Sequence, residues 1–149
     1  MITAMISFTP AGYAALSTRK LELLQKREEV VVRLQQAREM GDLSENGAYK
    51  AARFELSDTD RELRRLEYLL KEGKAVEPRT DGTVGMGNTV TVENQDGKQF
   101  TYMVVGTYEA DPLRGTISVE SPMGKELNGK RVKDAVEVNG NRFTVVEVV

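Results

Sequence analysis

Hydrophobic residues in the first half of the chain follow two seven-residue repeats, each typical of one long helix. The upstream repeat consists of Leu16, Leu23, Val30 and Ala37, with Leu24, Val31 and Leu34 widening the apolar stripe. The downstream repeat consists of Tyr49, Ala52, Leu56, Thr59, Leu63, Leu66 and Leu70. The downstream repeat predicts a helix over residues 46–72. Thr9-Pro10 marks the start of the other helix, because proline is favoured directly after a capping residue.

Only about five residues around Gly41 separate the two predicted helices. Each apolar seam is too hydrophobic to face water alone, so we expect the helices to fold back as an antiparallel hairpin. At 1.5 Å of rise per residue, helices of this length span roughly 40–45 Å. Residues 1–76 are therefore predicted to form a coiled-coil hairpin with its tip at residues 41–47.

The second half of the chain changes to short alternating runs that are typical of β-strands. Five strands are predicted, over residues 89–92, 100–105, 116–119, 135–138 and 143–148. Asn139-Gly140 is a strong hairpin signal, and Ser121-Pro122 is typical of the start of a short helix over residues 123–127. The predicted fold class is α+β, with a small antiparallel sheet and one short helix over residues 77–149.

The composition excludes several kinds of chemistry. The 149 residues include no histidine and no cysteine, so Ser-His and Cys-His catalytic pairs, disulfides and the usual zinc sites are impossible. Any metal must be held by oxygen, which indicates magnesium, calcium or manganese. The net charge of −2 argues against a stand-alone nucleic-acid binder. No apolar run would span a bilayer and no signal peptide is recognisable, so we expect a cytoplasmic protein.

The predicted tip carries two carboxylates, Asp42 and Glu45, which can converge on one hard cation. A plainer interpretation is that Asp42 caps the second helix and Glu45 completes a capping box. An EF-hand is excluded, because Arg53 occupies the position that requires a bidentate glutamate. A solvated turn explains the polarity of the tip but not the length of helix that presents it.

Several motifs resemble the GreA/GreB transcript-cleavage factors. The tip segment Gly-Asp-Leu-Ser-Glu-Asn, with Tyr49, Ala51-Ala52-Arg53 and Ala37-Arg38-Glu39 around it, is similar to the tip signature of that family. Agreement extends to Thr9-Pro10-Ala11-Gly12-Tyr13, Ser121-Pro122-Met123-Gly124-Lys125 and Leu127-Asn128-Gly129-Lys130. The resemblance covers nearly the whole chain, is closer to GreA at the tip, and implies an FKBP-like C-terminal domain. Departures from the family fall at Arg27-Glu28-Glu29, where a proline is usual, at Gly47-Ala48, and at Lys133, where a glycine is usual.

The resemblance implies a transcription elongation factor whose coiled coil enters the secondary channel of RNA polymerase. There it would stimulate the polymerase's own cleavage of backtracked RNA, without being an enzyme alone. Asp42 and Glu45 are implied to act in catalysis by completing the coordination of a second Mg²⁺, which the free protein does not bind. The free protein is expected to be a monomer with no membrane partner.

The resemblance also assigns roles outside the two acids. Arg38, Lys50 and Arg53 are implied to contact the extruded RNA 3′ end. The residues implied to dock on the polymerase are Ser121, Pro122 and Met123, and those implied to support the tip are Asn46 and Tyr49. Plainer alternatives are a salt-bridged helix surface for the basic residues, and a helix cap with a core methionine for the docking residues. For the function of the whole chain, three alternatives remain: a polymerase inhibitor of the same fold, a prolyl isomerase and a structural adaptor. The lack of tryptophan disfavours the prolyl isomerase.

Overall fold

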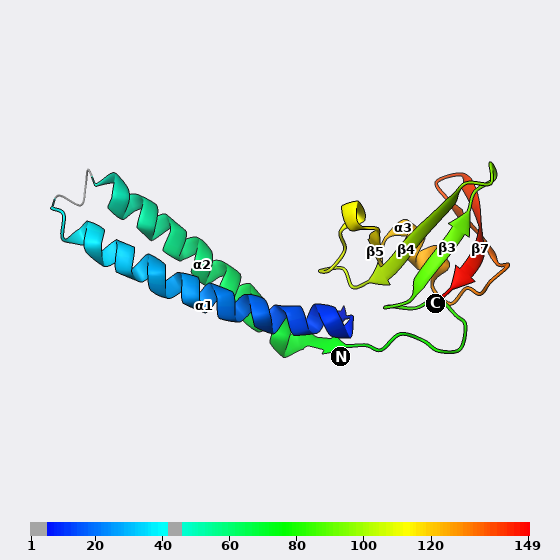
Figure 1. The fold of residues 1–149 in the computed structure, drawn as a ribbon, viewed down its shortest axis with the longest axis horizontal. Coiled ribbons are helices and arrows are strands. Elements are labelled where there is room, and N and C mark those ends of the chain that lie inside the picture. Colours follow the sequence, from blue (N-terminus) through cyan, green and yellow to red (C-terminus); the bar gives the residue numbers. More distant parts are fainter. Residues whose placement is uncertain (1–5, 42–45) are drawn as a thin grey trace, which may run out of the picture. The chain divides into compact units, whose positions relative to one another are not determined.

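A computed structural model describes residues 6–41 and 46–149 of the chain. They form two compact units, shown in Figure 1. The hairpin unit is Ala14–Glu72, and the globular unit joins Gly73–Val149 to the N-terminal residues up to Tyr13. The sequence instead predicts one hairpin domain over residues 1–76. No helix among the residues described is both long and apolar enough to cross a membrane.

Helices α1 (Pro10–Arg38) and α2 (Gly47–Glu72) lie side by side in Figure 1, and the hairpin unit contains all of α2 and all but the first four residues of α1. Both helices confirm the prediction from the heptad repeats. The backbone N–H of Gly12 donates to the Thr9 hydroxyl at 3.0 Å, so Thr9 is the N-cap of α1 and Pro10 is its first residue, as the sequence predicts.

One narrow seam of side chains joins the two helices. The buried residues of the two helices are Leu23, Val30 and Ala37 on α1 and Ala52, Thr59, Leu63, Leu66 and Leu69 on α2. Leu70, which the downstream repeat names, is only partly buried. Leu24 and Val31, which the sequence places in the stripe, are instead 42% and 39% exposed. Two paired helices bury only the residues that face the partner, so the flank of a wide stripe stays in water.

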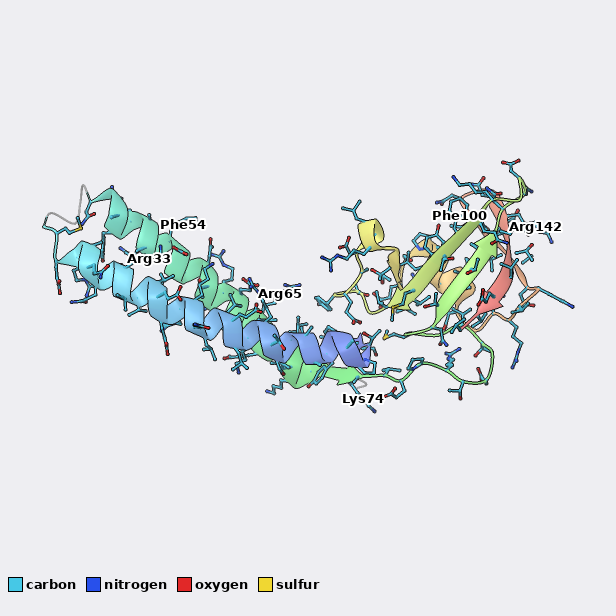
Figure 2. The ribbon with its side chains drawn as sticks, in the orientation of Figure 1. Arg33, Phe54, Arg65, Lys74, Phe100 and Arg142 are labelled. Atoms are coloured by element: carbon cyan, nitrogen blue, oxygen red, sulfur yellow. The ribbon has the colours of Figure 1, made fainter. Side chains whose placement is uncertain are left out.

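Ion pairs flank this seam. They join Arg19 to Glu62, Lys20 to Glu67, Lys26 and Arg33 to Glu55, and Arg27 to Asp60. Arg33 of α1, labelled in Figure 2, lies 2.9 Å from a Glu55 oxygen. Exposed pairs of this kind stabilise little, but they favour one alignment of two helices over others. Arg27 lies in the segment where the family usually has a proline, and its Nε donates to Asp60 across the two helices at 2.7 Å.

The globular unit holds a five-stranded sheet of order β5-β4-β3-β7-β6. Its strands are β3 (Thr89–Glu93), β4 (Gln99–Val105), β5 (Thr116–Ser118), β6 (Ala135–Val138) and β7 (Asn141–Val148). The α+β class is confirmed, but β5 runs parallel to β4, so the sheet is mixed and not wholly antiparallel. A crossover through the 3-10 turn η1 (Pro112–Arg114) replaces a hairpin between these two strands.

The core of the globular unit lies between this sheet and helix α3 (Pro122–Leu127). Its buried members are Val84, Val90, Val92, Val104, Leu127, Val136 and Val145. Outside this core, β1 (Ile6–Phe8) pairs in parallel with β2 (Gly73–Ala75). The sequence does not predict this pair, because three-residue strands are too short to show alternation.

Lys133 adopts a backbone φ of +82°, in the left-handed region that costs a side chain about 1 kcal/mol. It is also the position where the family usually has a glycine. We expect Lys133→Gly to raise the free energy of unfolding by about 0.5–1 kcal/mol, measured by urea denaturation of the full chain. Lys133→Ala is the control, since alanine keeps the Cβ atom and should not gain this stability. Equal effects of the two changes would contradict the backbone explanation.

Candidate functional site at the hairpin tip

The connection between the two long helices is the candidate site. Asp42 and Glu45, the predicted metal ligands, lie outside the described residues, so the structure describes only what borders them. On the upstream side α1 ends at Arg38, and Gly41 has a φ of +118° that side chains rarely adopt. On the downstream side α2 begins at Gly47.

Asn46 ties the two sides of this connection together. Its amide nitrogen donates to the Ala37 carbonyl oxygen near the end of α1, at 2.6 Å. Its side-chain oxygen accepts from the backbone N–H of Tyr49 at 3.1 Å, which makes Asn46 the N-cap of α2. The N-cap of α2 is therefore Asn46, while the interpretation that gives Asp42 a capping role falls on a residue outside the part of the chain that the structure describes.

Tyr49 brings two of the predicted basic residues together. The guanidinium carbons of Arg38 and Arg53 lie 5.8 and 5.9 Å from the centre of the Tyr49 ring. A hydrogen bond from Arg38, with smaller contributions from both guanidinium charges, lowers the pKa of the Tyr49 phenol below its ordinary value. Lys50, the third predicted basic residue, is exposed near the start of α2. Arg38 of α1 and Arg53 of α2 thus meet at the Tyr49 ring, close to the tip.

The predicted docking residues surround the start of α3 in the globular unit. Ser121 is the N-cap of α3, since the N–H of Gly124 donates to its hydroxyl at 3.1 Å. The same hydroxyl donates to the Ser118 carbonyl at 2.6 Å. Pro122 is exposed, whereas Met123 packs against the core. The capping alternative therefore holds for Ser121, while Pro122 remains accessible.

An apolar hollow of about 340 Å³ opens beside these docking residues. Its lining is Ile117, Ser121, Pro122, Met123, Val138, Asn139, Asn141 and Phe143. All three predicted docking residues thus border one concave surface.

Across residues 6–41 and 46–149, no group of three or more acidic side chains is placed to hold a metal ion. This finding does not extend to Asp42 and Glu45.

Comparison with known proteins identifies both units. Residues 6–74 match the family model described as transcription elongation factor, N-terminal, and residues 79–149 match transcription elongation factor, GreA/GreB, C-term. The GreA of Thermomicrobium roseum is 39% identical, covering 98% of this chain and 96% of its own length. The GreA of Bacillus subtilis is 44% identical, covering 80% of this chain and 79% of its own length.

The solved structure of the transcription factor Gfh1 is also similar. It is 27% identical to this chain, covers 99% of each chain and gives a TM-score of 0.50. Fold, tip sequence and both domain matches indicate one class, the transcription elongation factors of the Gre type. The chain belongs to the GreA/GreB family, and its similarity to proteins named GreA makes it GreA-like.

Proposed function

We propose that this protein stimulates the cleavage of backtracked RNA by RNA polymerase, with its hairpin inserted into the polymerase's secondary channel. The observation that carries the proposal is the capping of α2 by Asn46. Asp42 and Glu45 are not needed to cap that helix, yet both stand in the short connection between a 29-residue and a 26-residue helix. In this proposal the two acids act in the active centre of a partner. Relatives named transcription elongation factor GreA support this assignment.

The two acids fit a magnesium site that a partner completes. Carboxylate oxygens are suitable donors, but Mg²⁺ requires near-octahedral coordination, so two carboxylates are too few. Asp42 and Glu45 would therefore hold Mg²⁺ only together with ligands from the polymerase. Bound there, Mg²⁺ supplies charge stabilisation for phosphodiester hydrolysis. Glu45 is the better candidate to orient the attacking water and accept its proton.

The remaining residues have supporting roles in this proposal. Arg38, Lys50 and Arg53 contact phosphates of the extruded RNA 3′ end, and the hollow beside Ser121, Pro122 and Met123 docks on the polymerase. The alternative, an inhibitor that occupies the channel without supporting chemistry, predicts slower RNA synthesis without cleavage. The intact Asp-x-x-Glu spacing favours stimulation.

The protein with Mg²⁺ and naked RNA should give no cleavage above background, because two carboxylates are too few ligands to hold Mg²⁺ for catalysis. Adding it to a backtracked elongation complex at near-neutral pH should release a short 3′ fragment, measured on end-labelled RNA. The polymerase complex without the factor is the control. Hydrolysis of naked RNA would mean that the protein has its own active site, and inhibition without cleavage would favour the alternative.

A further inference from the structure

The Tyr49 ring is contacted by two cations that come from different helices, at 5.8 and 5.9 Å from its centre. Arg38 is the last residue of α1, whereas Arg53 follows Tyr49 by one turn of α2. Both arginines are exposed, and Tyr49 is partly buried. Two like charges near one ring repel each other, but the negative face of the ring attracts each guanidinium group. The pKa of the Tyr49 phenol, lowered chiefly by Arg38, agrees with this contact.

Two hydrogen bonds hold the backbone from which the Tyr49 side chain extends. The N–H of Tyr49 donates to Asn46, and the Asn46 amide donates to the carbonyl of Ala37, the residue before Arg38. This chain of two hydrogen bonds links the backbone of Tyr49 to that of α1 next to Arg38. The backbone at Tyr49 is therefore anchored by the same contacts that link the two sides of the connection. An exposed arginine normally samples many rotamers, and holding it in place lowers the entropy cost of its binding.

We propose that Tyr49 is a positioning residue that holds Arg38 and Arg53 together as one binding site for the phosphates of the extruded RNA strand. A guanidinium presents a planar fork of donors to a phosphate, and two held forks offer more than one charge-assisted hydrogen bond to it. The inference rests on the proposed function, since the RNA strand is the ligand. The inference goes beyond the proposed function because it makes the Tyr49 ring, in addition to the charges of Arg38 and Arg53, necessary for RNA binding.

The geometry is tested first in the free protein by NMR. In the wild type, the ring should shift the Nε–Hε signals of Arg38 and Arg53 upfield. Relaxation of the same signals should show that the motion of both side chains is restricted. Tyr49→Leu should remove both features, whereas Tyr49→Phe should keep the ring-induced shift. Tyr68→Leu is the matched control, because Tyr68 is an exposed tyrosine on the same helix. Unshifted wild-type arginine signals would overturn the proposal.

RNA binding is tested by the salt dependence of cleavage in a backtracked elongation complex. For Tyr49→Leu, the factor concentration that gives half-maximal cleavage should rise roughly tenfold near 150 mM salt, while the rate at saturation changes little. The slope of log affinity against log salt should become shallower by about 0.7 for each RNA phosphate that the variant no longer neutralises. Tyr49→Phe should stay within about threefold of wild type, and Tyr68→Leu should match it.

The possible failures are distinguishable. A wild-type protein that does not stimulate cleavage overturns the proposed function, and this inference with it. A stimulating wild type with an unchanged salt slope in folded Tyr49→Leu overturns only the positioning role. An equal loss of affinity for a complex without extruded RNA would assign the arginine pair to a protein surface of the polymerase and also overturn it. If Tyr49→Leu does not fold, Tyr49→Phe decides, since a loss much above threefold contradicts the role of the ring.

Discussion

Asp42→Asn should lower the stimulation of RNA cleavage by at least the roughly 10–100-fold that loss of a partner of a metal ligand typically costs, although asparagine caps a helix about as well as aspartate does. A hard divalent cation strongly prefers a carboxylate to a neutral amide, so the change removes a ligand with almost no change of shape. The structure sharpens this expectation, because the N-cap of α2 is Asn46. The test is cleavage by a backtracked elongation complex across a range of Mg²⁺ concentrations.

Raising Mg²⁺ should partly rescue Asp42→Asn, since loss of one ligand chiefly lowers the occupancy of the site. Asp42→Ala should fail by a similar factor, and both variants should keep the melting curve of the hairpin and the affinity for polymerase. Asn46→Ala is the contrasting control: it removes the cap and should lower hairpin stability by about 1 kcal/mol. Near wild-type cleavage by Asp42→Asn at low Mg²⁺ would leave Glu45 as the single catalytic candidate.

The sequence predicts the hairpin well because its signal is local. A heptad repeat names the residues that face a partner helix, and Leu23, Val30 and Leu63 are buried as it indicates. The repeat does not state how wide the contact is, so Leu24 and Val31 are misassigned. That width depends on the partner surface, which no single helix encodes.

The globular unit shows the opposite limit. Each of its five strands is predicted within a few residues, because alternation and turn signals such as Asn139-Gly140 are local. The parallel pairings of β5 with β4 and of β1 with β2 join segments without a hairpin turn between them. Nothing in the local pattern specifies such pairings, which follow from packing of the whole unit.

At the candidate site, the sequence identifies the residues but not their contacts. It names Asn46 and Tyr49 as supports, yet the bond from Asn46 to the Ala37 carbonyl depends on the closed hairpin. It names Arg38 and Arg53 as basic residues, but their meeting at one ring requires the two helices to align. The family motif predicts which residues form the site, whereas the distances between them are known only from the folded structure.

Gly124→Ala should destabilise the globular unit by about 2 kcal/mol or more, through overpacking. A Cβ atom at position 124 would lie 2.0 Å from the backbone oxygen of Ser118, far inside van der Waals contact. The Ser118 oxygen belongs to the backbone and cannot rotate away as a side chain can. The clash can therefore be relieved only if α3 moves away from β5. The shift would also strain the Ser121 hydroxyl, which bonds both Ser118 and Gly124.

The Tm is measured by thermal unfolding, and the local stability of β4 and β5 by hydrogen exchange. The affinity for polymerase is measured on the same variants. For a unit of this size, a loss of 2 kcal/mol corresponds to a fall in Tm of roughly 8–16 °C. Lys125→Ala is the matched control, because Lys125 is the exposed next residue of α3 and should be near neutral. Docking should weaken in Gly124→Ala, since α3 carries Pro122 at the edge of the hollow. An unchanged Tm would mean that α3 moves without cost, and the fixed position assigned to the docking residues would be wrong.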